Sequence, residues 1–386
     1  MKKRKEFLSY GKQWIYDEDI EEVVKALKSD YLTTGPAILE CEKSLCKYIG
    51  CKYAVLFSSG TAALHGAMFS IDIKEGDEVI LPAMSFAATA NVVKYLGGIP
   101  VFADIDKETY TITKETVEPL INKKTKAIIP VHYTGQPCDL DELNQLCDKY
   151  KLKLVEDGAH ALGAKYKGKL LKSFRDMMMV SFHPVKHITS GEGGVIFTDN
   201  KEYYNKLIQF RSHGITRDND FLENKENAAY YYEQQFLGYN YRLTDFQAVL
   251  LKSQLKHLDF FLSKRRKLAN EYFLALKDFE EIVCPFQADY GESSYHLFVI
   301  NLKDKYKDQR DFIFNEMKKR NIGVNVHYIP IYYHPYYQKL GYKKGLCKNT
   351  ERLYEGLITL PLHPKMEKED VLEVSQILRE CLDLVK

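Results

Sequence analysis

Residues 177–194 read MMMVSFHPVKHITSGEGG, a run that begins as an apolar strand and ends in a glycine-rich turn. Lys186 lies between the two and is flanked by Val185 and His187. A lysine amine attacks a carbonyl only when it is partly unprotonated and rigidly aimed, and a packed strand end supplies both conditions. Most lysines are solvated surface charges. The pattern nevertheless indicates a lysine that forms a Schiff base, provided that other residues support the assignment.

Short apolar runs alternate with helical patterns on both sides of this stretch. Predicted strands cover 53–57, 78–81, 100–105, 127–132, 153–156, 177–182 and 194–198. Predicted helices cover 20–27, 36–50, 60–69, 113–121 and 139–150. Alternating strands and helices with nearly continuous apolar strands predict an α/β fold, in which a mostly parallel sheet is covered on both faces.

The pattern changes after about residue 260. A long charged helix is predicted over 260–276, followed by shorter strands and helices. We therefore expect a large domain over 1–260, which includes the N-terminal helices, and a smaller C-terminal α/β domain over 261–386. The polar segment 217–227 is predicted to be a mobile loop.

Composition narrows the class of protein. The chain has 386 residues, 28% of them charged, and a formal net charge of +2, which does not favour nucleic acid or a membrane as a partner. The eight cysteines lack metal-type spacing and are read as reduced structural thiols. Neither a secretion signal nor a long apolar span follows the basic N-terminus, so we expect a cytoplasmic protein without a metal.

In such a sheet, ligands bind beyond the carboxyl ends of the strands. Asp157 follows one predicted strand and could hold the protonated nitrogen of a pyridine ring, although Asp-Gly also caps ordinary turns. Gly60 and Thr61 open a helix directly after another strand, so their N–H groups suit a phosphate, and Ser181 could reach the same phosphate. Together with Lys186, these residues predict a pyridoxal 5'-phosphate site.

Aromatic residues add candidates around that ring. Phe86 could stack on the ring face opposite His160 or Ala159, although an aromatic after a strand is more often a core residue. His183 and His187 flank the lysine and could relay protons or simply pack. The proline-punctuated segment 327–337, which begins with His327 and Tyr328, could stack on a sugar or a base, with subunit packing as an equal alternative.

Several of these motifs, in this order, resemble those of the DegT/StrS-type nucleotide-sugar aminotransferases. The resemblance spans nearly the whole chain and rests on YLTTGP (31–36), FSSGTAAL (57–64), LPAMSF (81–86), DID (104–106), HYTGQP (132–137), EDGAH (156–160), the lysine segment, GYNYRLT (238–244) and LPLHP (360–364). It implies the fold-type I architecture of aspartate aminotransferase, with a seven-stranded, mostly parallel sheet in the large domain.

The resemblance also implies roles for single residues. Lys186 looks like the lysine that binds the cofactor, Asp157 like the partner of the ring nitrogen, and Phe86 like the stacking aromatic. His160 looks like the residue near the phenolic oxygen of the ring. Gly60, Thr61 and Ser181 look like phosphate ligands. Asn240 resembles an asparagine that reaches the phosphate from the neighbouring subunit, which implies a homodimer with shared active sites.

The motifs FHPVK (182–186) and GEGG (191–194) resemble those of two groups of enzymes. These are the UDP-4-amino-4,6-dideoxy-N-acetyl-β-L-altrosamine transaminases of pseudaminic acid synthesis and the related aminoarabinose transaminases. This resemblance implies transfer of the amino group of L-glutamate to a UDP-linked 4-keto-6-deoxy-N-acetylhexosamine, with His183, His327 and Tyr328 as candidate substrate contacts. The alternatives are another nucleotide sugar, such as a 4-keto pentose or a dTDP-linked 3- or 4-keto-6-deoxyhexose, or a non-catalytic cofactor-binding sensor. The sugar 3-dehydratase branch, which replaces the lysine by histidine, is not favoured because Lys186 is present.

Overall fold

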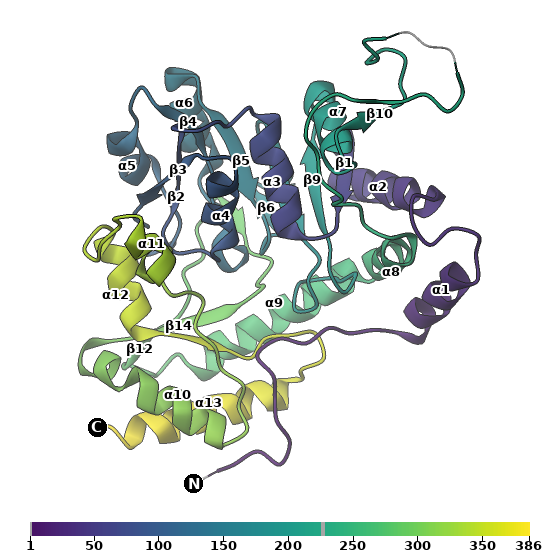
Figure 1. Cartoon of the computed structure of the whole chain (residues 1–386). Coiled ribbons are helices and arrows are strands. Elements are labelled where there is room, and N and C mark those ends of the chain that lie inside the picture. Colours follow the sequence, from purple (N-terminus) through teal and green to yellow (C-terminus); the bar gives the residue numbers. More distant parts are fainter. Residues whose placement is uncertain (1, 225–227) are drawn as a thin grey trace.

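A seven-stranded sheet forms the centre of the computed structural model, which describes residues 2–224 and 228–386 (Figure 1). Its strand order is β1-β9-β8-β5-β4-β2-β3. The strands are β1 (Tyr53–Phe57), β2 (Glu78–Pro82), β3 (Ile99–Ala103), β4 (Thr125–Ile128), β5 (Lys153–Asp157), β8 (Met177–Ser181) and β9 (Gly194–Thr198). Only β9 runs antiparallel to its neighbours β1 and β8, so the predicted mostly parallel sheet is confirmed.

The strand predicted over 127–132 ends four residues earlier in the structure, at Ile128, as β4. Ile129 still donates its N–H to the Ile80 carbonyl at 2.8 Å, but Pro130 has no N–H with which to continue the ladder. The Pro130 carbonyl instead accepts the N–H of Asp157 at 2.8 Å. Proline therefore ends the regular strand while keeping the segment beside β5.

Helices cover both faces of the sheet, as its apolar strands require. On β1, Ala54 and Leu56 point into one core and Val55 and Phe57 into the other, because successive strand side chains alternate. One core is covered by α2 (Pro36–Ile49), α6 (Leu140–Tyr150) and α8 (Asp245–Leu255), and the other by α3 (Gly60–Ser70), α4 (Ala88–Tyr95) and α7 (Lys201–Phe210). Helix α1 (Asp17–Leu27) packs on α8, whereas the helix predicted over 113–121 is a short α5 (Lys114–Val117) followed by a 3-10 turn at Glu118–Leu120.

The C-terminal part has its own core around a three-stranded antiparallel sheet of order β12-β14-β15. Its strands are β12 (Ile282–Val283), β14 (Phe298–Leu302) and β15 (Leu357–Leu360), and its helices include α10 (Arg310–Lys319), α12 (Lys348–Gly356) and α13 (Lys368–Asp383). Helix α9 (Leu258–Ala275) connects both parts: Phe261 packs in the first core, whereas Leu268 and Tyr272 pack in the C-terminal one. The predicted domain boundary after residue 260 thus falls inside α9, and the division itself stays a prediction.

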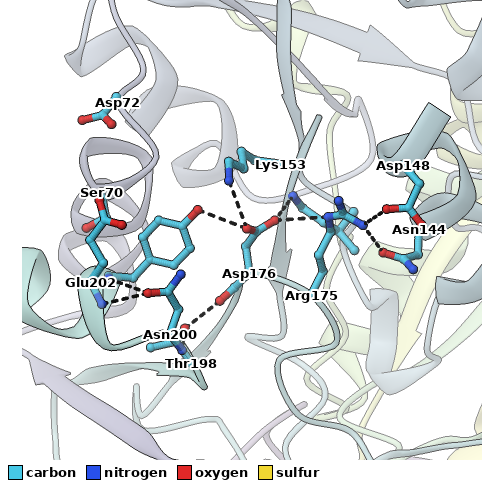
Figure 2. Close-up of polar contacts among 12 residues, drawn as sticks. Ser70, Asp72, Asn144, Asp148, Lys153, Arg175, Asp176, Thr198, Asn200 and Glu202 are labelled. Carbon is cyan, nitrogen blue, oxygen red and sulfur yellow. Dashed lines mark hydrogen bonds and ion pairs between the residues drawn. The ribbon is translucent and has the colours of Figure 1, made fainter. Parts of the chain in front are cut away.

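Asp176 directly precedes β8 and connects the amino ends of β5 and β8 with the carboxyl end of the antiparallel β9, at the edge of the sheet opposite the predicted site (Figure 2). Its carboxylate accepts the N–H of Leu154 at 2.9 Å and the hydroxyl of Tyr203 at 3.1 Å. Its carbonyl accepts the Thr198 hydroxyl at 2.7 Å, and Lys153 forms an ion pair with it at 3.6 Å. These contacts join β5, β8 and β9 to one another and to α7. They fix β5 and β8 at the ends opposite the predicted site.

The remaining elements are short. They are β6 (Lys165–Tyr166), β7 (Lys169–Leu170) and β13 (Gly291–Glu292) in one small sheet, β10 (Ile215–Thr216) and β11 (Glu233–Gln234) in another, and α11 (Pro335–Lys339). Residues 225–227 of the loop predicted over 217–227 lie outside the described residues. None of the helices within 2–224 and 228–386 has both the length and the apolarity that a membrane span needs.

Candidate active site

A cavity of about 680 Å³ opens at the carboxyl ends of β1, β5 and β8, between the central sheet and residues of the C-terminal part. The fold therefore places it where ligands bind in open α/β sheets. Of the residues predicted for the site, those that line the cavity are Gly60, Thr61, Phe86, Asp157, His160, Ser181, His183, Lys186, His327 and Tyr328. Sequence positions up to 268 residues apart are thus brought to one place.

The first turn of α3 forms one wall of the cavity. Ser59 caps this helix, and its hydroxyl accepts the N–H of Ala62 at 3.1 Å. The N–H groups of Gly60 and Thr61 have no carbonyl in a preceding turn to which they could donate, so they are directed at the cavity end of the helix. A Cβ atom on Gly60 would lie 3.1 Å from Cβ of Ser181, which explains why glycine suits this close approach of α3 to β8. The wall is suited to an anion such as a phosphate.

Asp157 ends β5 and is 5% exposed. Its Oδ2 accepts the Thr89 hydroxyl at 2.8 Å, and its Oδ1 accepts the N–H of Ala159 at 3.1 Å. Burial raises the pKa of Asp157 from its ordinary value, whereas the two hydrogen bonds and the nearby Lys186 act in the opposite direction. A buried carboxyl group with fixed donors on both oxygens is pre-oriented to receive a cationic ring N–H.

Lys186 follows β8 in a loop that folds back on Phe182. The Phe182 carbonyl accepts the Thr189 hydroxyl at 2.9 Å and the N–H of Ser190 at 3.1 Å, which fixes both ends of the loop. Burial lowers the pKa of the Lys186 amine to about 8, and Arg265 adds to this effect while Asp157 opposes it. The amine is therefore close to the protonation state that nucleophilic attack requires.

The opposite wall comes from the segment that precedes α11. The Tyr328 hydroxyl lies 2.9 Å from Nε2 of His160, and Nδ1 of His327 lies 2.9 Å from the Thr359 hydroxyl on β15. The Tyr133 hydroxyl donates to the His327 carbonyl. Phe86, which is 62% exposed, lies at the rim with its ring centroid 6.1 Å from that of Tyr328. The predicted aromatic segment therefore does reach the site through its first two residues.

Two predicted candidates do not line the cavity. Asn240 is exposed and pairs with Ser212 through a backbone bridge. His187 is buried behind the lysine, with its ring centroid 5.3 Å from that of His296. His187 thus packs beneath the site, and the expected contact of Asn240 with a neighbouring subunit stays a prediction.

The sequence argument missed several residues that the structure places at the site. They include Tyr10, Thr89, His296 and Asn325. Thr89 follows Ser85 by four residues at the start of α4, and the two hydroxyl oxygens lie 2.7 Å apart, so helical spacing from the LPAMSF motif could have identified it. His296 precedes an apolar strand and carried no such signal.

These residues fit pyridoxal phosphate. Gly60, Thr61 and Ser181 line the cavity together, and a larger side chain at position 60 would crowd Ser181. A bound cofactor would find the buried carboxyl group of Asp157 for its ring nitrogen and the Lys186 amine, with its lowered pKa, for its aldehyde. Such a set can hold the ring, its phosphate and its reactive carbon at three separate points.

Comparison with known proteins gives the same family along the whole chain. The model of the DegT/DnrJ/EryC1/StrS aminotransferase family matches residues 13–379. The UDP-4-amino-4,6-dideoxy-N-acetyl-beta-L-altrosamine transaminase of Campylobacter jejuni is 36% identical over 394 aligned residues, which cover 98% of either chain.

Solved structures are similar as well. Helicobacter pylori PseC, an aminotransferase involved in the biosynthesis of pseudoaminic acid, superposes with a TM-score of 0.92 at 32% identity and covers 98% of this chain and 100% of its own. The putative sugar aminotransferase Spr1654 of Streptococcus pneumoniae, in its PLP form, also has a TM-score of 0.92, at 30% identity and with the same coverage of the two chains. A PMP form of the latter protein matches equally well.

Proposed function

The chain belongs to the DegT/DnrJ/EryC1/StrS aminotransferase family, and on this premise we propose that it transfers the amino group of L-glutamate to a UDP-linked 4-keto-6-deoxy-N-acetylhexosamine. The family makes the protein a pyridoxal phosphate-dependent sugar aminotransferase. The products would be 2-oxoglutarate and a 4-amino sugar, UDP-4-amino-4,6-dideoxy-N-acetyl-β-L-altrosamine, for pseudaminic acid or a related surface glycan. The choice of sugar rests on the similarity to the Campylobacter jejuni transaminase, which covers 98% of both chains.

In the proposed site, Gly60, Thr61 and Ser181 hold the cofactor phosphate, Asp157 faces the ring nitrogen, and Phe86 and His160 contact the ring. When bound, pyridoxal phosphate supplies a conjugated ring that accepts the electron pair left behind when a carbon beside its nitrogen loses a proton. Asp157 favours this role because its negative charge stabilises the protonated ring nitrogen.

Lys186 holds and moves the proton. Its amine, with a pKa near 8, can take the proton from the α-carbon of glutamate. It can then deliver this proton to the cofactor carbon on the other side of the amino nitrogen. In the second half-reaction it performs the transfers in the opposite order on the sugar. One amine therefore serves both halves, since both substrates occupy the same cavity in turn.

His327, Tyr328 and His183 line the cavity, and the sugar nucleotide is proposed to lie against them. Tyr328 and His160 are joined at 2.9 Å, so a sugar contact to Tyr328 would be transmitted to the ring-facing histidine. Asn240 is proposed to complete the phosphate site of a neighbouring copy in a homodimer. Asn240 is exposed and does not line the cavity of its own chain, which supports this arrangement.

The test is product analysis. The purified, cofactor-loaded protein is incubated with L-glutamate and a panel of UDP- and dTDP-linked 4-keto and 3-keto sugars, and the products are identified by mass spectrometry and NMR. We expect the UDP-linked N-acetylhexosamine to give the 4-amino sugar, and one molecule of 2-oxoglutarate to form for each molecule of amino sugar. Turnover of another sugar alone would contradict the proposed substrate, and the use of L-alanine or L-aspartate but not L-glutamate would contradict the donor.

A further inference from the structure

Among the described residues, only His296 has a ring nitrogen in contact with the Lys186 amine. Its Nε2 lies 3.5 Å from Nζ of Lys186, and the ring lines the same cavity. The side chain is 3% exposed and lies between two other histidine rings, with centroid distances of 4.5 Å to His160 and 5.3 Å to His187. The proposed roles of the site leave His296 without a function.

The backbone of His296 is held from two sides. Its N–H donates to the Thr134 carbonyl at 2.8 Å, and its carbonyl accepts Nη1 of Arg265 at 3.1 Å. The same guanidinium group binds the carbonyls of Tyr295 and Leu362, and in the described chain no carboxylate pairs with it. The preceding Tyr295 has a positive φ of 45°, which is uncommon for a bulky residue. The imidazole is therefore fixed at a set place relative to the lysine.

Simple packing does not account for a histidine here. Within residues 2–224 and 228–386, Nδ1 of His296 is buried without a hydrogen-bond partner, which is costly for a polar ring. An apolar side chain would pack without this cost. The imidazole is uncharged, because burial and then the Lys186 charge hold its pKa well below the usual range. The His296 ring can therefore accept a hydrogen bond from the Lys186 amine, but it does not keep a proton taken from that amine.

We propose that His296 is a positioning residue for Lys186. The His296 ring holds the free Lys186 amine in the orientation from which the amine joins the cofactor aldehyde. In that step the amine nitrogen forms a C=N bond to the aldehyde carbon while the C=O bond breaks, and the aldehyde oxygen leaves as water with the two hydrogens of the amine. A small error in the approach of two reacting groups can slow a reaction strongly, so the fixed ring would accelerate attachment without contributing to cofactor affinity.

The experiment compares His296→Asn with His296→Gln in the full-length, cofactor-free protein. Both amides are polar and tolerate burial alike, but only the glutamine amide extends to the position of Nε2. Two quantities are measured for each: the rate at which bound pyridoxal phosphate becomes covalently attached, followed by absorbance, and the affinity for pyridoxamine phosphate, which cannot bond to a lysine.

We expect His296→Asn to slow attachment by about tenfold or more, with pyridoxamine phosphate affinity within about twofold of wild type, and His296→Gln to restore most of the rate. Wild-type attachment in His296→Asn would overturn the proposal. An equal loss of pyridoxamine phosphate binding would also overturn it, because it would show a structural role only. Neither glutamate nor a sugar is present, so the result is independent of the proposed substrate.

Discussion

The Thr89 hydroxyl donates a 2.8 Å hydrogen bond to Oδ2 of Asp157, and this contact connects the first turn of α4 to the carboxyl end of β5. Ser85, whose hydroxyl oxygen lies 2.7 Å from that of Thr89, extends the chain of hydroxyls. The carboxylate that is proposed to face the cofactor ring is thus oriented by a neighbouring helix and not only by its own strand. It follows that Thr89 influences the site without touching the ring nitrogen.

Thr89→Val tests this connection. Valine keeps the shape of threonine but removes the donor, which is worth about 1–3 kcal/mol at a buried charged acceptor. The Asp157 pKa should rise further, and kcat should fall by about 10- to 100-fold because the ring nitrogen is held less well in its protonated form. Steady-state kinetics measure the effect, and Thr89→Ser, which keeps the hydroxyl, serves as the control. Unchanged kcat in Thr89→Val would show that the hydrogen bond has no part in the reaction.

The lowered pKa of Lys186 predicts a pH dependence. Because the amine reacts only when unprotonated, its reactivity in the cofactor-free protein should rise with pH through a midpoint of about 8 and level off above it. Competitive labelling with an amine reagent, read by peptide mass spectrometry, gives this midpoint. Lys25, whose pKa is raised by the hydrogen bond to Glu22, serves as an internal reference and should titrate at clearly higher pH. A common midpoint for both lysines would contradict the proposed environment of Lys186.

Gly60→Ala probes the proposed phosphate site. The new Cβ would lie 3.1 Å from Cβ of Ser181 and 3.3 Å from the Met179 sulfur, so α3 and β8 must separate slightly. We expect the affinity for pyridoxamine phosphate to fall by about tenfold, measured by fluorescence titration. Gly168→Asn is the control, since a Cβ there meets nothing within 4 Å and asparagine tolerates its positive φ. Equal affinities of the wild type and Gly60→Ala would remove α3 from the phosphate site.

A mixing experiment tests the shared site. Lys186→Ala and Asn240→Ala should each have little activity, but a mixed dimer would contain one site with an intact lysine and an intact asparagine. Random reassociation should therefore recover about a quarter of the wild-type activity per total protein, because half of the dimers are mixed and each has one intact site of two. If the mixture is no more active than the variants alone, then Asn240 does not complete the site of the partner.

Much of the fold follows from local sequence. β1 and β9 were predicted with their observed bounds, and β5 and β8 to within one residue, because each is a short apolar run between turn signals. The strand over 127–132 was misplaced because Pro130 interrupts the ladder although its neighbours are apolar. Pro119 likewise coincides with the change from α5 to a 3-10 turn, so the predicted helix was too long.

The site was predicted only in part. Residues that follow strands, such as Gly60, Asp157 and Lys186, could be found because the carboxyl ends of parallel strands meet at one edge. His296 could not, since its place depends on the packing of the C-terminal part against α9 and on the Thr134 carbonyl, which lie far from it in sequence. The roles of the predicted residues stay predictions that the variants above test.

The most direct measurement is borohydride reduction of the protein loaded with pyridoxal phosphate, followed by proteolysis and peptide mass spectrometry. The account predicts that the reduced cofactor is attached to Lys186, in about one equivalent per chain. An unmodified Lys186 peptide, or attachment at another lysine, would contradict it.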